Sequence, residues 1–216
     1  MGLARGLERR LERLVDGLAA HLFRGRIHPV ELGTRIVREA DLGVFETHAG
    51  PGAPNAFVVT LGGEIEPAEA VAEAERELEA VMSQAAAERG WRLEGPVTVT
   101  IRFGDGAASS ASVQTAVEPG PVAPWAYLEP VNGSPLELRV NRSVIGRSST
   151  ADVHLTSDDV SRQHALLWRE AGVIWLADLD SANGTFVNDE RLTDVMDLFN
   201  GDLITLGGTD LILRVL

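Results

Sequence analysis

Apolar positions in the first part of the chain recur at helical spacing. Six leucines, each three or four residues from the next, predict a helix over about residues 3–23 with one apolar face. They are Leu3, Leu7, Leu11, Leu14, Leu18 and Leu22. Acidic residues interleave the arginines on the other face, which favours packing on the helix's own domain. The alternative is a basic amphipathic helix that docks on a membrane surface.

The next stretch predicts a second and a third helix. Gly25 breaks the first pattern, and Pro29 suits the first turn of a helix that reaches about Ala40. Glu66-Pro67 opens the third helix, and Gly90 stands just past its end. Seven glutamates lie between Glu64 and Glu79, and we interpret most of them as a solvated face.

Extended patterns surround the third helix. Residues 47–55 are rich in glycine and proline and predict a loop, and residues 56–61 predict a strand. A further strand is predicted over residues 97–103, with residues 111–117 pairing to it. The order of helices and strands predicts an α+β domain in the first half of the chain.

The second half of the chain shows only short β-type runs and no helical period. Together they predict an all-β sandwich of two antiparallel sheets, with its ligand-binding loops at one end. The runs cover residues 126–131, 136–140, 143–145, 165–168, 173–176, 203–206 and 210–215. The pairs Asn141-Arg142, Asn188-Asp189 and Gly207-Gly208 are interpreted as hairpin turns.

A proline-rich segment separates the two halves. Three prolines fall between Glu118 and Pro124, a composition typical of an extended, semi-rigid spacer. The predicted organisation is therefore an α+β domain over residues 1–115, a linker over 116–124 and a sandwich over 125–216.

Composition narrows the functional classes. The 216 residues carry a net charge of −13, which disfavours non-specific nucleic-acid binding. There is no cysteine and the five histidines show no ligand spacing, so we expect neither a disulfide framework nor a metal site, and no cofactor. No run of apolar residues is long enough to span a membrane, and the N-terminus lacks a signal-peptide core. A cytoplasmic protein is expected.

Polar residues gather in three loops between predicted strands. These loops carry Gly146-Arg147-Ser148, Ser161-Arg162-Gln163-His164 and Ser181-Ala182-Asn183-Gly184-Thr185. An arginine offers a fork of donors matched to phosphate oxygens, and serine hydroxyls or an asparagine amide complete such a site. The loops therefore predict a pocket for a phosphopeptide.

In order and spacing, the three blocks resemble the signature of the forkhead-associated (FHA) domain. The resemblance covers about residues 124–216 and implies a two-sheet sandwich that binds phosphothreonine peptides without catalysis. It implies that Arg147 pairs with the phosphate, that Ser161 also bonds a phosphate oxygen, and that Asn183 holds the peptide backbone. Arg162 is expected to contact the peptide or the phosphate, and Ser148 to act as a neighbouring donor.

Four further residues are expected to support the pocket rather than to contact its ligand. Gly146 and Gly184 are interpreted as turn residues that permit unusual φ angles, and His164 as a buttress that ties the loops together. The fourth is Thr185, at the end of the third block.

The sequence departs from the FHA pattern at two positions. Ala182 replaces a common Thr or Ser, so a supplementary polar contact is expected to be missing. Asp189 stands where glycine is common, which puts the geometry of its turn in question.

The first half carries its own, shorter resemblance. Residues 24–31, 54–59 and 90–97 resemble the N-terminal domain of the actinobacterial FhaA family. The resemblance covers roughly residues 3–115 and implies a non-enzymatic interaction module tied to Ser/Thr-kinase signalling and cell-wall synthesis. The expected partners are phosphothreonine proteins, among them a Ser/Thr kinase or its substrates.

Two alternatives remain beside this reading. Ser161, His164 and Asp178 offer the residue types of a hydrolase triad, but no glycine flanks the serine as a nucleophile elbow requires. The other alternative is that the sandwich binds a phosphothreonine of its own chain, for which Thr47 and Thr115 are the candidates.

Overall fold

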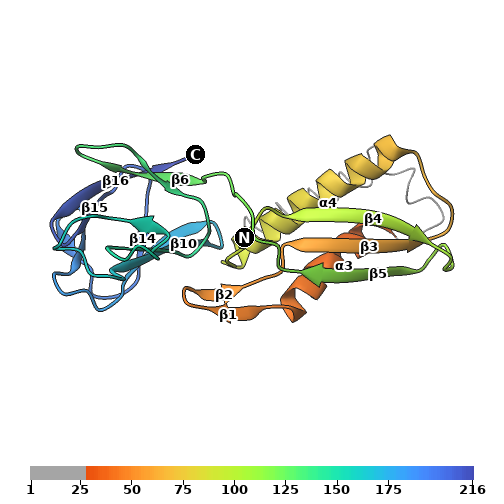
Figure 1. The fold of residues 1–216 in the computed structure, drawn as a ribbon, viewed down its shortest axis with the longest axis horizontal. Helices are drawn as coiled ribbons and strands as arrows, with labels where there is room; N and C mark the ends of the chain where they lie inside the picture. Colours follow the sequence, from red (N-terminus) through yellow and green to blue (C-terminus); the bar gives the residue numbers. More distant parts are fainter. Residues whose placement is uncertain (1–27) are drawn as a thin grey trace. The chain divides into compact units, whose positions relative to one another are not determined.

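The computed structural model describes residues 28–216, so the helix predicted over residues 3–23 lies outside the described residues. Contacts divide the chain into two compact units (Figure 1). The described part of the first unit comprises residues 28–46, 51–89 and 93–121. The second comprises residues 47–50, 90–92 and 122–216. The predicted fold class, an α+β domain followed by a β-sandwich, is confirmed.

Two helices and a three-stranded sheet form the first unit. The helices are α3 (Pro29–Leu42) and α4 (Ala68–Glu88), and the strands are β3 (Ala56–Gly62), β4 (Thr98–Gly104) and β5 (Ala111–Ala116). His28 accepts a bond from the Val30 backbone N–H through its Nδ1 and so caps α3, while proline occupies the first helical position. Helix α4 packs on β4, and α3 packs on β5 and on α4, so both helices cover one face of the sheet (Figure 1).

The strand order corrects the predicted pairing of residues 111–117. Strand β3 lies in the centre, parallel to β4 and antiparallel to β5, so β5 pairs with β3 and not with β4. The physical reason is burial, because β3 is mostly apolar and buried along its length while β5 is mostly exposed. The helix between β3 and β4 supplies the crossover that a parallel pair needs.

Two other expectations for the first half need correction. The predicted loop over residues 47–55 contains part of a small hairpin, formed by β1 (Phe45–Thr47) and β2 (Gly50–Gly52). In the predicted linker, Glu118 exchanges two hydrogen bonds with the buried Asn55 side chain, through Oδ1 and Nδ2, both at 2.9 Å. Gly120 bonds the Glu94 carbonyl at 3.0 Å, so the start of this segment is held within the first unit.

Two sheets pack face to face in the second unit. The strands are β6 (Ala126–Pro130), β7 (Leu136–Leu138), β8 (Ser143–Gly146), β9 (Val153–His154), β10 (Ala165–Glu170), β11 (Val173–Asp178), β12 (Thr185–Val187), β13 (Glu190–Arg191), β14 (Met196–Leu198), β15 (Leu203–Leu206) and β16 (Thr209–Val215). One sheet has the order β14-β11-β10-β8-β9 and the other β13-β12-β15-β16-β6-β7. All pairs are antiparallel except β8 with β9. A core of apolar side chains such as Leu128, Ile145 and Leu167 fills the space between them.

Two of the three predicted hairpin turns are confirmed. Asn188-Asp189 joins β12 to β13, and Gly207-Gly208 joins β15 to β16. The prediction for Asn141-Arg142 was wrong, because β7 and β8 belong to different sheets. Arg142, which has a positive φ of 58°, instead lies in the connection that leads from β7 in one sheet to β8 in the other.

Candidate functional site

The three predicted loops meet at an open pocket of about 530 Å³. It is lined by Arg147, Ser148, Ser161, Arg162, Gln163 and Leu179. Arg147 and Ser148 follow β8, residues 161–163 precede β10, and Leu179 follows β11. Two arginines and no acidic residue line the pocket, so it is a local positive site on a chain of net charge −13. Its lining favours an anion.

Backbone bonds join the first loop to the second. Arg147 donates its N–H to the Ser161 carbonyl at 2.8 Å, and Ser148 donates to the Arg162 carbonyl at 3.1 Å. A Cβ at Gly146 would lie 2.2 Å from the Arg162 carbonyl oxygen. Gly146 is therefore needed for close approach, and the expectation of an unusual φ there was wrong, since its φ is not positive.

The Arg147 guanidinium is tethered on one side and exposed on the other. Its Nε donates to the Val160 carbonyl at 3.0 Å, which fixes the plane of the group. No described residue accepts from its two terminal nitrogens, so their N–H donors remain for a ligand. A rigid fork of this kind matches the oxygens of a phosphate.

Ser161 is oriented by its neighbours. Its Oγ accepts a hydrogen bond from the Ala182 backbone N–H at 3.0 Å, which ties the third loop to the second. With a lone pair of the oxygen occupied in this way, the hydroxyl proton is free to be donated into the pocket. Ser148 is held in a similar way, because its Oγ lies 2.8 Å from Thr150 Oγ1 and accepts from the Thr150 N–H at 3.2 Å.

His164 lies fully buried behind the pocket. Its Nδ1 accepts from the Ser161 backbone N–H at 3.0 Å, so that nitrogen carries no proton. The other ring nitrogen, Nε2, therefore donates to the Gly184 carbonyl, 3.1 Å away. Backbone bonds from His164 to Ile145 and from Leu179 to His164 complete the connection. One side chain thus links the second loop to the third.

Asp178 holds the third loop in shape. Its Oδ1 accepts from the hydroxyls of Ser181 and Thr185, each at 2.6 Å, and its Oδ2 accepts from the Ser181 N–H at 2.9 Å. Burial by itself raises the pKa of the Asp178 carboxyl, but the bonds from Ser181 and Thr185 outweigh it and bring the pKa below its ordinary value. The carboxylate is the form that this loop requires.

Comparison with known families gives two matches that do not overlap. Residues 143–207 match the FHA domain, and residues 5–107 match the N-terminal domain of FhaA. The chain belongs to the FHA-domain proteins of the FhaA type. The predicted family is thereby confirmed.

Individual relatives include FHA-domain proteins. The FHA domain-containing protein FhaA of Mycobacterium tuberculosis is 36% identical over 88 residues, which cover 41% of this chain and 16% of FhaA. A solved FhaA FHA domain, complexed with the intracellular domain of Rv3910, is 35% identical and covers 41% of this chain and 99% of its own, with a TM-score of 0.39. EmbR of Mycobacterium tuberculosis, in complex with a low-affinity phosphopeptide, is 31% identical with a TM-score of 0.40, over 42% of this chain and 24% of its own. The chain thus spans only a small part of full-length FhaA.

Asn183 of the FHA domain does not line the pocket. Its side chain is exposed, and its Nδ2 donates to the Asp159 carbonyl at 2.8 Å. This bond joins the third loop to residues 157–160, while no described residue donates to its Oδ1. Asn183 therefore lies outside the pocket lining, with its amide nitrogen engaged and its amide oxygen without a partner among the described residues.

Glycine is required in the FHA domain for two different structural reasons, a positive φ angle and a close backbone contact. Gly184 has a φ of +84°, which fits the expected turn residue. Gly207, which sequence reasoning treated only as part of a hairpin, is also a contact residue. A Cβ there would lie 2.0 Å from the Asp159 carbonyl oxygen. No local sequence signal distinguishes this second role.

The departure at Asp189 leaves the turn intact. Asn188 and Asp189 have φ values of 49° and 69°, as a two-residue turn with two left-handed positions requires. The Asn188 side chain bonds Asp202 Oδ1 and the Leu203 N–H, both at 3.0 Å. The turn keeps its geometry without glycine, and it lies outside the pocket lining.

The hydrolase alternative does not match the contacts. His164 accepts a hydrogen bond from the backbone N–H of Ser161 and not from its hydroxyl, and its other ring nitrogen donates to the Gly184 carbonyl. Asp178 accepts from Ser181 and Thr185 instead of orienting the imidazole. The three side chains therefore form no serine–histidine–aspartate relay.

Sequence reasoning missed part of this site. Gln163 and Leu179 line the pocket, and the Asp159 carbonyl and the Ala182 N–H connect its loops. Gln163 lies inside the second motif, so its position was a usable signal. Among residues 28–216 no group of three or more His, Asp or Glu side chains is placed to hold a metal. No helix in the same range is long and apolar enough to cross a membrane.

Proposed function

We propose that this chain is a non-catalytic adaptor that docks onto phosphothreonine-containing proteins. The observation that carries the proposal is the pocket in which Arg147 and Ser161 present free donors beside Ser148 and Arg162, with no acid in the lining. A phosphothreonine brings about −1.5 to −2 charges and three acceptor oxygens. Two of the similar structures support the same ligand class: EmbR was solved with a low-affinity phosphopeptide, and another structure concerns phosphothreonine-dependent FHA domain interactions.

The site residues keep their proposed roles on this basis. Arg147 and Ser161 bind the phosphate, and Ser148 and Arg162 extend the donor set at the edge of the pocket. Asn183 holds the peptide backbone through its amide oxygen, which has no partner among the described residues. Gly146, His164, Gly184 and Thr185 support the loops. The two compact units correspond to an FhaA-type interaction domain and an FHA domain.

The proposed setting is Ser/Thr-kinase signalling in the cytoplasm, where ATP-dependent kinases produce the ligand. Partners are then a kinase itself or its substrates, and the link to cell-wall synthesis stays a prediction from the FhaA-type match. Membrane association is proposed to occur only through a partner, and nucleic acid is not an expected ligand.

Titration of a phosphothreonine peptide library tests the proposal. The wild-type chain is expected to bind selected peptides with micromolar Kd and to ignore their unphosphorylated forms. Loss of a bond to a charged group costs about 1.5–3 kcal/mol, so Arg147→Ala should weaken binding by about tenfold or more. Arg214→Ala is the matched control, because it removes an exposed arginine that pairs with Glu129 and not with the pocket. If the unphosphorylated peptides bind as tightly as their phosphorylated forms, the proposal is wrong.

Binding to a phosphothreonine of the same chain remains a second hypothesis. Thr115 is exposed on β5 and open to a kinase. Thr47 fits less well, because its hydroxyl donates to the Gly50 carbonyl at 2.7 Å and accepts from the Ala49 N–H at 3.1 Å. Kinase treatment followed by mass spectrometry and peptide competition decides between them; absence of phosphate on both threonines excludes these sites.

A further inference from the structure

An arginine from the FhaA-type stretch of the sequence is buried in the second unit. Arg92 lies within residues 5–107, which match the FhaA N-terminal domain, yet its segment, residues 90–92, groups with the sandwich. Its side chain is 6% exposed and forms a two-point ion pair with Asp152, with Nη1 2.9 Å from Oδ2 and Nη2 2.8 Å from Oδ1. Nη1 also donates to the Arg142 carbonyl at 3.1 Å. Both carboxylate oxygens are therefore bonded by one buried guanidinium.

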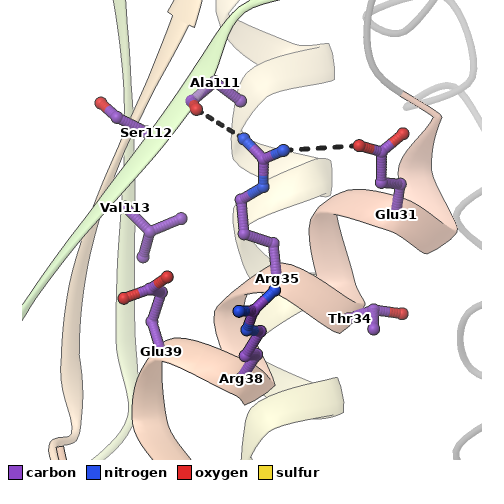
Figure 2. Close-up of a pocket in the computed structure, with 8 residues that line it drawn as sticks. All are labelled: Glu31, Thr34, Arg35, Arg38, Glu39, Ala111, Ser112 and Val113. Carbon is purple, nitrogen blue, oxygen red and sulfur yellow. Dashed lines mark hydrogen bonds and ion pairs between the residues drawn. The ribbon is translucent and has the colours of Figure 1, made fainter. Parts of the chain in front are cut away.

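Arg35 of the first unit shows how unusual this burial is. It makes the same two kinds of contact, since it donates to the Ala111 carbonyl at 2.6 Å and pairs with Glu31 at 3.4 Å (Figure 2). Its side chain is 37% exposed, however, and that of Glu31 is 61% exposed. A pair so open to water contributes little, whereas removal of one partner of a buried pair leaves a charge without compensation. The Arg92–Asp152 pair is of the second kind.

Asp152 ends the first loop of the candidate pocket. Strand β8 ends at Gly146 and β9 begins at Val153, so six residues, including Arg147 and Ser148, join them. The two strands are parallel, and parallel neighbours usually need a connection of about a dozen residues or more. The ladder between them has two residue pairs, so a tight loop with a short ladder requires further contacts to hold its shape.

The Asp152 carboxylate supplies such a contact at the base of the loop. Its Oδ2 accepts from the Val144 N–H in β8 at 2.8 Å. The register pairs Ile145 with Val153, so Val144 is the residue opposite Asp152, and the carboxylate extends the ladder by one bond. The oxygen that closes the loop is the same oxygen that Arg92 Nη1 contacts. Arg92 therefore fixes the group that joins the end of the loop to the strand before it.

The rest of the loop depends on that junction. Among residues 28–216, the hydrogen bonds of residues 149–151 go to Ser148: the Ala151 N–H donates to its carbonyl at 3.1 Å, and Thr150 Oγ1 lies 2.8 Å from its hydroxyl. Residues 149–151 are thus held by Ser148 on one side and by Asp152 on the other. A displacement of Asp152 therefore reaches the Ser148 hydroxyl through this segment.

We propose that Arg92 is a positioning residue of the pocket, because it holds the Asp152 carboxylate and so fixes the loop that presents Arg147 and Ser148. Arg92 does not line the pocket and acts on it through Asp152. The effect on phosphothreonine affinity rests on the proposed function of the pocket, whereas the effect on the order of the loop does not.

Loss of the guanidinium leaves the carboxylate poorly compensated. Its remaining partners among residues 28–216 are the Val144 N–H and His48, whose Nε2 lies 3.8 Å from Oδ2 and whose side chain is 48% exposed. A carboxylate without a buried partner is drawn toward water, and this displaces the end of the loop. Residues 90–92 themselves stay attached, because the Trp91 side chain is buried and Asn141 Nδ2 donates to the Trp91 carbonyl at 3.3 Å.

Phosphopeptide titration of full-length variants measures the effect on affinity. Arg92→Met removes the charge but keeps an unbranched apolar side chain, and it should raise the Kd of the best library peptide about fivefold. Arg92→Lys keeps the charge but not the two-point pair and should raise it less. Arg35→Met is the matched control, since it removes the same kinds of contact from the first unit, and should leave the Kd unchanged. Circular dichroism checks that each variant is folded. An unchanged Kd for Arg92→Met contradicts the proposal.

A double-mutant cycle separates positioning from general stability. Ser148→Ala removes a donor that the loop presents, so the double variant with Arg92→Met should lose less affinity than the two single losses combined. Asn183→Ala acts in the third loop, so its loss should combine in full with that of Arg92→Met. If both cycles are additive, the Arg92 effect is a loss of folded protein and the proposal is wrong.

Hydrogen exchange without any ligand tests the loop directly. The backbone N–H groups of Arg147, Ser148 and Ala151 are hydrogen-bonded, and their exchange should become about fivefold faster in Arg92→Met while β10 and β11 stay unchanged. Unchanged exchange in the loop, or faster exchange throughout the sandwich, overturns the proposal. If the wild type binds no phosphothreonine peptide, the proposed function is wrong, and the exchange measurement alone decides whether Arg92 orders the loop.

Discussion

Asp178→Asn isolates the charge that holds the third loop of the pocket. Asparagine keeps one oxygen for the hydroxyls of Ser181 and Thr185 but removes the negative charge, and bonds to a neutral acceptor are roughly half as strong. The other position becomes an N–H₂ group that faces the Ser181 N–H, so that bond is lost. Because the carboxylate is partly exposed, we expect a loss of about 2 kcal/mol in the free energy of unfolding at neutral pH.

The effect of Asp178→Asn must depend on pH. The folded-state pKa of Asp178 lies below its ordinary value of 3.8, so the unfolded chain takes up the proton first as the pH falls. The stabilisation from the carboxylate is therefore complete above the unfolded-state pKa. It is lost as the pH falls through the folded-state pKa, and the gap between wild type and variant should close in that window.

Denaturant titration followed by tryptophan fluorescence measures this gap. All four tryptophans belong to the second unit, so the signal reports on the unit that carries Asp178. The comparison of wild type and Asp178→Asn at neutral and acidic pH supplies its own control, since other carboxylates titrate in both proteins. A gap that stays constant between neutral pH and pH values below 3.8 would refute the reasoning.

Three further substitutions test the loop geometry by the same denaturant assay. Gly146→Ala places a methyl group 2.2 Å from the Arg162 carbonyl and should cost about 1–3 kcal/mol; an unchanged midpoint contradicts this close approach. His164→Phe leaves the Ser161 N–H unpaired and removes one of the two bonds to the Gly184 carbonyl, which keeps only the Gly207 N–H among the described residues, so we expect a loss of about 1–3 kcal/mol. The variant should also weaken phosphopeptide binding, and retained affinity would count against the buttress role. Asp189→Gly relieves a left-handed residue and should stabilise by about 1 kcal/mol without changing affinity; destabilisation would mean that the aspartate has an unrecognised contact.

Long, periodic or strongly apolar elements were predictable from the sequence. The helix expected from Pro29 to about Ala40 extends from Pro29 to Leu42, and the strand expected over residues 56–61 spans Ala56–Gly62. The short strands β9 and β13 have two residues each, too few for an alternating pattern to show. Sheet order was not accessible either, because β5 pairs with β3 through burial of the whole sheet and not through any local signal.

The position of the candidate site was predictable from the sequence, but the hydrogen bonds that join its loops were not. The motif blocks placed Arg147 and Ser148 in one loop and Ser161 and Arg162 in another, and these side chains do line one pocket. Asn183 turned out to bond the Asp159 carbonyl, a partner 24 residues away that no local pattern indicates. Such contacts arise from the packing of the two sheets, which brings loops together only after the core has formed.

The loop between residues 157 and 163 has a consequence for how recognition can change. Two glycines press against its backbone, Gly207 at Asp159 and Gly146 at Arg162, and Asn183 holds the Asp159 carbonyl. The exposed side chains of this loop, in contrast, are held by no described residue: Asp158, Arg162 and Gln163. Evolution or directed selection can therefore exchange those side chains to alter peptide preference while the backbone that shapes the pocket stays where it is.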